Sequence, residues 1–299
     1  MNNQTPASGS PRPRFSRAGE TGDAGFAALE PVTGRLGLRA YLRELAARRD
    51  FIFTVPRQEL QAQHLNTVLG NLWFLVNPLL QTAVYYLIFG LLLETDRGLD
   101  NFIVYLVVGV LTLGYFNQTL TKASHLMEAN ETLIRSIYFP RAVIPAASAL
   151  TNLYNYLPAF AVMLFVALIT GERPSWRWLL LPLILGALFL FVSGAGFLFA
   201  RLGNAFRDLS QIVPHGTRLL FYASGTIFDP RAFSTDPAVL IWFELNPIYQ
   251  FLTLIRWCLI DVATPWWFWV TAPAWAVFSL AIGFLVFWRG ELSYGSTRR

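Results

Sequence analysis

The sequence predicts an all-α polytopic membrane protein with six transmembrane helices. Two observations carry this prediction. The chain of 299 residues is 55% hydrophobic and only 14% charged. Its apolar residues are gathered into runs of about 20 residues, the length that a helix needs to cross a bilayer. The stretches between these runs add an N-terminal amphipathic interfacial helix, a short cytoplasmic helix in one loop, and outer re-entrant half-helices near the C-terminus.

The N-terminal region is predicted to lie in the cytoplasm and on the membrane surface. Residues 1–35 are rich in Gly, Pro, Ser and Arg and have no apolar core, which predicts a disordered tail rather than a signal peptide. Residues 36–65 are expected to form an amphipathic helix, because Leu38, Leu42 and Leu45 recur at helical spacing while arginines occupy other faces. Such a helix suits an anionic membrane surface. The alternative is an ordinary surface helix packed on protein.

Six apolar runs are predicted to be membrane spans within a transmembrane domain of residues 66–290. They cover residues 72–93, 102–120, 142–169, 178–200, 209–228 and 266–288. Asn152 and Asn155 lie in the middle of the third run, which indicates contact with protein or water rather than lipid. Residues 291–299 are predicted to be a cytoplasmic tail.

The segment 229–265 is expected to lie on the outer side. Its stretch 238–262 is apolar, but it also carries charged residues and Pro247. If this stretch does not span, the side that holds both termini carries seventeen of the 23 Lys and Arg residues. The positive-inside rule then places both termini in the cytoplasm. We therefore predict two half-helices, hinged at Asn246–Pro247, that dip into the outer leaflet.

The loop 121–141 is longer than a minimal turn between spans requires. Asn130 is a candidate N-cap, and Glu131 lies where a carboxylate favours the positive end of a helix. Four apolar side chains then share one helical face: Leu133, Ile134, Ile137 and Tyr138. Pro140 prevents continuation of the helix. Residues 130–139 are therefore predicted to form a short amphipathic helix that either docks in the groove of a soluble partner or rests on lipid.

The motifs of several enzyme classes are missing from the sequence. There is no G-x-x-x-x-G-K-[ST] phosphate loop, the three histidines are scattered, and the six predicted spans contain no Asp or Glu. Cys258 is the lone cysteine, so no internal disulfide and no thiolate metal cluster is expected. We predict no catalytic residue, metal, cofactor or nucleic-acid partner for this chain. An energy-coupled transporter of this kind would need a partner that hydrolyses ATP.

Four stretches together resemble the membrane subunit of ABC-2-type exporters, in the polysaccharide or O-antigen branch. They are RRD at 48–50 followed by TVLGNLWFLVNP at 67–78, NETLIRSIYFPRAVIPAASALTN at 130–152, FRDL at 206–209 with Ser224 and Ile227, and LNPIYQFLTLIR at 245–256. The third departs from the family's Ser-Pro-Ile, since Gly225 and Thr226 intervene. The resemblance covers about Leu36 to Arg289. Within it, the residue sequence is most similar to that of exporters of lipid-linked galactan in mycobacterial-type cell walls.

The resemblance implies a homodimer that carries two cytoplasmic ATPase subunits, which bind ATP and Mg. The cargo would be a polyprenyl-diphosphate-linked glycan that moves outward through a channel between the two protomers. The helix at 130–139 would be the coupling helix, which meets the ATPase through Glu131, Leu133, Ile134, Ile137, Tyr138 and Arg141. Segment 229–265 would form the outer gate, with Asn246, Pro247 and Arg256 as gate residues.

Arg218 is a candidate for contact with the cargo. It lies about ten residues into the fifth predicted span, hence roughly 15 Å deep at 1.5 Å per residue. A charge at that depth is costly unless it faces water, a partner or an anion. Contact with the cargo's diphosphate is one interpretation, and pairing with backbone carbonyls or snorkelling are the others.

Five aromatic residues are candidates for the channel wall. Aromatic faces can stack on sugar rings without requiring one hydroxyl pattern, and the candidates are Tyr85, Tyr86, Phe89, Tyr115 and Phe116. Ordinary packing is the alternative for each of them. At the level of function, the alternatives are an ABC-2 permease for a drug or lipid, and an intramembrane glycosyl- or acyltransferase. The missing acidic pairs and the absence of a catalytic histidine oppose the transferase.

Overall fold

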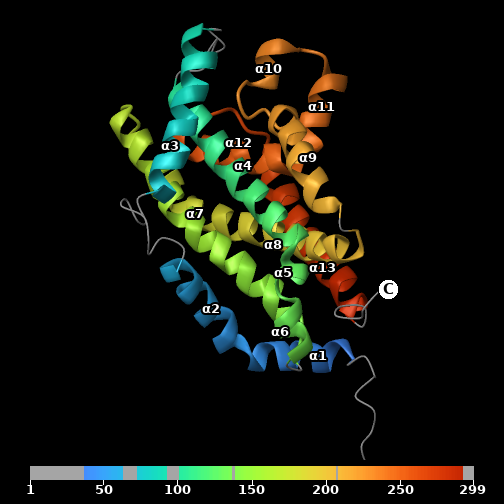
Figure 1. Ribbon diagram of the computed structural model, residues 1–299. Helices are drawn as coiled ribbons and strands as arrows, with labels where there is room; N and C mark the ends of the chain where they lie inside the picture. Colours follow the sequence, from blue (N-terminus) through green and yellow to red (C-terminus); the bar gives the residue numbers. More distant parts are fainter. Residues whose placement is uncertain (1–36, 63–72, 93–100, 137–138, 207, 292–299) are drawn as a thin grey trace, which may run out of the picture. The chain divides into compact units, whose positions relative to one another are not determined.

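The computed structural model describes residues 37–62, 73–92, 101–136, 139–206 and 208–291. Within these ranges the regular structure is entirely helical, which confirms the predicted all-α class (Figure 1).

Two helices, rather than one, form the N-terminal amphipathic region. α1 (Leu38–Ala47) ends at Arg48, and α2 (Arg49–Ala62) follows directly. Tyr41 on α1 is buried, and its hydroxyl accepts a hydrogen bond from the Ala142 N–H at 3.1 Å. α2 packs against the third predicted span. Both helices therefore pack on protein, while Leu42 and Phe53 remain exposed for contact with a membrane.

Among the described residues, four helices are long and apolar enough to cross a bilayer. They are α4 (Phe102–Ser124), α7 (Val143–Ile169), the continuous helix Trp176–Ala205, and α13 (Phe268–Arg289). The third of these begins with the 3-10 turn η3 (Trp176–Leu180) and continues as α8 (Leu181–Ala205). These helices correspond to the second, third, fourth and sixth predicted spans.

The first and fifth predicted spans are represented by shorter or irregular helices. α3 (Trp73–Tyr85) changes into the π-helix η2 (Tyr86–Leu92). α9 (Leu209–Ala223) has 15 residues, fewer than the roughly 20 that cross a bilayer without tilt or thinning. It ends where Gly225 adopts a positive φ of 57° and reverses the chain. The structure supports four spans, or five with a bent pair, so the predicted total of six stays a prediction.

The long loop between α4 and α7 contains two short helices. α5 (Leu126–Ala129) and α6 (Glu131–Ser136) are separated by Asn130. The side-chain amide of Asn130 donates to the Leu126 carbonyl at 2.9 Å, so it links back to α5.

The outer segment contains α10 (Pro230–Phe233), α11 (Pro237–Leu245) and α12 (Pro247–Ile260). α11 and α12 meet at an angle of 88°. The Asn246 side chain accepts from the Ile248 N–H at 2.9 Å, and its amide donates to Ser224 Oγ at 3.1 Å. The bend therefore lies at the predicted Asn246–Pro247 hinge. Its depth in the membrane stays a prediction.

The centre of the bundle is α4, which is buried along most of its length. It contacts α3, α7, α8, α9 and α12. The most extensive helix pair is α8 with α13. A Cβ added at Gly194 or at Gly283 would collide with the backbone of the other helix, and Ser279 Oγ donates to the Phe191 carbonyl at 2.9 Å. Glycines allow this approach of two membrane helices to backbone contact.

Candidate functional site

A polar stripe runs along the exposed face of α9. It consists of Gln211, His215, Arg218 and Tyr222, all of which are exposed. Their spacing of four, three and four residues places them within about 60° of one another, given 3.6 residues per turn. The opposite side of α9 is apolar and packs on α4 through Val213, Thr217 and Phe221, which are buried. We call these four exposed residues the α9 polar stripe.

The α9 polar stripe is unsuited to face lipid. If α9 belongs to the fifth predicted span, a charged arginine and three further polar groups at that depth are costly unless they meet water, protein or an anion. Arg218 is exposed, and the described residues give it no hydrogen bond or ion pair. Pairing with backbone carbonyls inside its own subunit, one alternative for Arg218, is therefore not what the structure shows. The stripe is open to a second subunit or to a water-filled path.

One aromatic candidate of the first predicted span, Tyr85, contacts α9. The Tyr85 ring stacks on Phe221 of α9 with centroids 5.0 Å apart, and it lies 6.2 Å from the Phe89 ring. Tyr85, Tyr86 and Phe89 are all half-buried. Each of these three rings is therefore partly packed within the subunit and partly accessible, and the contact of Tyr85 with α9 is made on the buried side of that helix.

The other two aromatic candidates are in the core. Tyr115 and Phe116 are buried, and their rings stack on Tyr156 and Phe191 with centroids 4.7 and 5.8 Å apart. The Tyr156 hydroxyl shares a hydrogen bond of 2.9 Å with Thr112. In this subunit Tyr115 and Phe116 pack helices together, and the geometry gives them no surface for a sugar ring.

Arg256 of α12 is fully buried and clamps three segments together. Its Nε and Nη2 donate to the Tyr105 carbonyl at 3.2 and 3.0 Å. Its Nη1 donates to the Gly225 carbonyl, and its Nη2 also donates to the Thr226 carbonyl, both at 2.9 Å. The guanidinium carbon lies 3.3 Å from the centroid of the Tyr105 ring, a cation–π contact. Arg256 therefore joins α12 to α4 and to the turn after α9.

Tyr105 and Gly109 complete this clamp from α4. The Tyr105 hydroxyl donates to the Gly225 and Phe228 carbonyls at 3.0 and 2.9 Å. A Cβ at position 109 would lie 2.6 Å from the Thr226 carbonyl oxygen and 2.8 Å from Arg256 Nη2. Gly109 is thus needed for the close approach of the turn.

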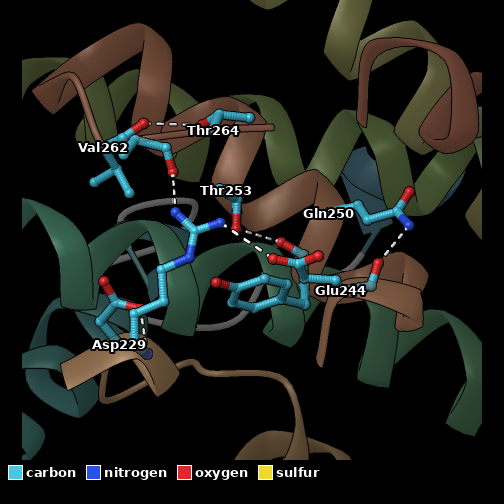
Figure 2. A network of polar contacts seen from close by, with 9 residues as sticks. Asp229, Glu244, Gln250, Thr253, Val262 and Thr264 are labelled. Carbon is cyan, nitrogen blue, oxygen red and sulfur yellow. Dashed lines mark hydrogen bonds and ion pairs between the residues drawn. The ribbon is translucent and has the colours of Figure 1, made fainter. Parts of the chain in front are cut away.

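A second polar network joins the outer helices (Figure 2). Arg231 pairs with Glu244 at 3.3 Å and donates to the Ala263 carbonyl at 2.8 Å. The Gln250 amide donates to the Glu244 carbonyl at 2.7 Å, and Thr271 donates to Gln250 Oε1 at 2.9 Å. These contacts hold α10, α11, α12 and the start of α13 to one another.

The candidate coupling region has an exposed polar face. Ile134 is buried and Leu133 is half-buried beside Phe51 of α2, so part of the predicted apolar stripe packs on its own chain. Glu131 and Arg135 are exposed and form an ion pair on α6. Ile137 and Tyr138 lie outside the described residues, so their docking role stays a prediction.

Arg141 connects the end of this region to the C-terminus. Its backbone N–H donates to Glu291 Oε1 at 3.1 Å, and its guanidinium donates to the Glu291 carbonyl. Burial raises the pKa of the Glu291 carboxyl, while the hydrogen bond from the Arg141 N–H acts in the opposite direction. The structure therefore places Arg141 between α6 and the end of α13.

Sequence reasoning missed several of these groups. Glu59 of α2 accepts from Lys122 at 2.5 Å and from Thr151 at 3.1 Å, and it thereby joins α2 to α4 and α7. No spacing rule connects such distant positions. The α9 polar stripe could have been found, since its members recur at helical spacing. Within the described ranges, no group of three or more His, Cys, Asp or Glu could hold a metal ion.

These features define a multi-pass α-helical membrane protein with an exposed polar stripe on α9 and short helices in the loop between α4 and α7. The family model described as ABC-2 type transporter matches residues 51–260, and the chain belongs to this family. An O-antigen export system permease protein RfbA of Myxococcus xanthus is 26% identical over 212 residues, which are 71% of this chain and 81% of that protein.

Two further relatives come from the same branch of the family. An RfbA of Klebsiella pneumoniae is 29% identical over 222 residues, which cover 69% of this chain and 85% of the relative. The polysialic acid transport protein KpsM of Escherichia coli is 23% identical over 192 residues, with coverage of 63% and 72%. The predicted resemblance to polysaccharide-export permeases is thereby confirmed.

Proposed function

We propose that this chain is the membrane subunit of an exporter that moves a polyprenyl-diphosphate-linked polysaccharide out of the cytoplasm, driven by ATP hydrolysis in a partner subunit. The observation that carries the proposal is the α9 polar stripe. It is a continuous row of polar side chains on the helix of the fifth predicted span, and it is exposed in the single subunit. A second copy of the chain would shield such a row from lipid, and a symmetric pair of stripes would line a polar path between the copies.

The character of this path suits a glycan with a charged lipid carrier. Gln211 and Tyr222 can exchange hydrogen bonds with hydroxyl groups, and the half-buried Tyr85 ring stacks on Phe221 of α9. Arg218 supplies the positive charge that a diphosphate requires. The names of the relatives, O-antigen and polysialic acid, point to polysaccharide. The sequence resemblance to galactan exporters favours a galactan as the repeating polymer.

The partner is proposed to be a pair of cytoplasmic ATP-binding subunits that contact α5, α6 and the residues after them. The distribution of Lys and Arg supports a topology with both termini in the cytoplasm, in an inner or plasma membrane. α6 lies on that same side, and its exposed Glu131–Arg135 pair is accessible there. ATP and Mg would be bound by the partner, since the chain has no phosphate loop.

The purified chain alone is expected to hydrolyse no ATP, and co-purification with its ATP-binding partner should restore hydrolysis. The measurement is phosphate release in vesicles, with a partner that lacks its phosphate-loop lysine as the control. Phosphate release by the isolated chain, from preparations free of other ATPases, would contradict the proposal that ATP is hydrolysed by the partner subunit.

Export itself is tested by deleting the gene and measuring glycan on the cell surface and lipid-linked glycan inside the cell. The expected result is loss of surface glycan together with accumulation of the lipid-linked polymer in the inner leaflet. Unchanged glycan together with sensitivity to a drug would instead support the drug permease. Lack of the polymer in both places would support a transferase.

Ile137→Asp is expected to abolish co-purification of the ATP-binding partner while the chain still inserts into the membrane. Anchor residues in a protein groove contribute roughly 2 kcal/mol or more each, and an unpaired charge in that groove costs several kcal/mol more. The measurement is a pull-down of the partner, with Ile137→Val as the conservative control. Undiminished recovery with normal export would show that the helix rests on lipid instead.

A further inference from the structure

An apolar groove of about 570 Å³ lies between α8 and α13, with α12 as its floor. Its walls come from Pro182 to Leu190 on α8 and from Trp269 to Val277 on α13, and its floor is formed by Phe251 and Leu254. Its lining side chains are all hydrocarbon or aromatic. The groove is separate from the α9 polar stripe and from the cytoplasmic loop.

The contact between the two wall helices explains why the groove opens where it does. α8 and α13 touch backbone to backbone at Gly194 and Gly283, and Ser279 binds the Phe191 carbonyl. All groove residues of α8 and α13 precede this contact in sequence. The helices are thus closed at the contact and leave room towards their N-terminal ends, which the proposed topology places in the outer leaflet.

The mouth of the groove carries an aromatic cluster and an ion pair. Trp269, which lines the groove, has its ring centroid 5.3 Å from that of Trp257. The guanidinium of Arg177 lies 4.5 Å from the centroid of the Trp257 ring and pairs with the Asp261 carboxylate. The exposed Trp176 completes the cluster at 6.2 Å from Trp257. Tryptophans and a solvent-facing ion pair of this kind are typical of the membrane–water interface.

We propose that this groove binds one outer-leaflet glycerophospholipid with a phosphoethanolamine headgroup. One acyl chain would lie in the groove, the phosphate would meet Arg177, and the ammonium group would meet Asp261. The Arg177–Asp261 ion pair is complementary to a headgroup that carries one charge of each sign. An anionic headgroup would meet the Asp261 carboxylate, whose side chain is 71% exposed. The proposal concerns a bound lipid, so it holds whatever the exported cargo is.

The length of the groove favours an acyl chain over a polyprenyl chain. Pro182 to Leu190 covers eight residue steps, or about 12 Å at 1.5 Å per residue. This is less than the roughly 15 Å of one leaflet in a hydrocarbon core of about 30 Å. A polyprenyl chain would extend beyond it. The surrounding surface is also apolar, with Leu183, Val270 and Val277 each more than 60% exposed, as expected of a face towards lipid.

The test uses the complete chain in nanodiscs of phosphatidylglycerol, which lacks the ammonium group, that contain a phosphatidylethanolamine with a photoreactive diazirine in one acyl chain. Labelled peptides are mapped by mass spectrometry. We expect labels on groove residues such as Leu190 and Val277, in excess over Leu285 further along α13. Gly186→Phe should reduce the groove label at least fivefold, because a Cβ at Gly186 meets open space and the ring would fill the groove.

Gly114→Phe is the matched control, since a Cβ there also meets open space, and it should leave the groove label unchanged. Leu190→Trp replaces Gly186→Phe if that variant does not accumulate. Asp261→Asn suits the left-handed conformation of this residue, whose φ is 55°. It should remove the preference for the ethanolamine probe over a phosphatidylglycerol probe.

Several results would overturn the proposal. Equal labelling of the groove and of Leu285 would show ordinary lipid contact. A groove label unchanged by both groove-filling variants would place the probe elsewhere. Displacement of the probe by polyprenyl phosphate, or cross-links between groove residues of two copies, would assign the groove to a different occupant. None of these outcomes would contradict the proposed export function, because the lipid proposal does not depend on it.

Discussion

Arg256→Met is expected to prevent stable accumulation of the protein. Arg256 is 1% exposed and supplies four hydrogen bonds to the carbonyls of Tyr105, Gly225 and Thr226. A hydrogen bond from a charged group contributes about 1.5–3 kcal/mol, and a buried acceptor left without a partner is costly. The free energy of unfolding of a whole domain is only about 5–15 kcal/mol. Loss of the four hydrogen bonds therefore removes a large share of it.

The measurement is the amount of protein in the membrane and its thermal transition after extraction. Arg256→Lys should be intermediate, because a single ammonium group cannot reproduce the planar fork that reaches three carbonyls. Gly109→Ala should also destabilise the protein, since its Cβ would lie 2.6 Å from the Thr226 carbonyl oxygen. Arg173→Met, at an exposed position, is the matched control. Normal accumulation of Arg256→Met with loss of export alone would make Arg256 a transport residue rather than a clamp.

The segment 238–262 illustrates how much of the fold the sequence could predict. Its hydrophobicity and its proline predicted a broken helix hinged at Asn246–Pro247, and the structure has an 88° bend there. The same segment carries three charges whose partners could not be predicted. Glu244 pairs with Arg231, Asp261 pairs with Arg177, and Arg256 binds backbone carbonyls. Local periodicity determines the helix, but a partner dozens of residues away depends on the packing of the whole bundle.

The candidate site shows the same limit. The sequence placed Arg218 in a membrane helix, and the structure leaves it exposed on the α9 polar stripe. The sequence could not distinguish Tyr85 from Tyr115, because both are aromatic residues in apolar runs. The structure separates them, since Tyr115 is 3% exposed and stacks on Tyr156 whereas Tyr85 is half-buried beside α9. Which face of a helix is covered depends on its neighbours, which a single sequence does not name.

Arg218→Leu is expected to lower export about tenfold to a hundredfold while the protein accumulates normally. The expected size follows from the loss of a charged hydrogen bond to an anion, about 1.5–3 kcal/mol, at about 1.4 kcal/mol per factor of ten. Folding should be unaffected, because the side chain is exposed in the subunit. Arg218→Lys should retain part of the export, and Arg218→Ala very little. The measurement is surface glycan per unit of membrane protein.

The control for Arg218 is a leucine exchange on the neighbouring face of the same helix. Leu219 is 73% exposed and lies beside the α9 polar stripe, so Leu219→Ala changes the helix surface without removing a charge and should export normally. Normal export by Arg218→Leu would make the arginine idle in transport. Loss of the protein itself in the Lys, Ala and Leu variants alike would assign Arg218 to contacts between subunits. Export that falls with loss of the charge, at constant protein level, is the result that only a path along α9 explains.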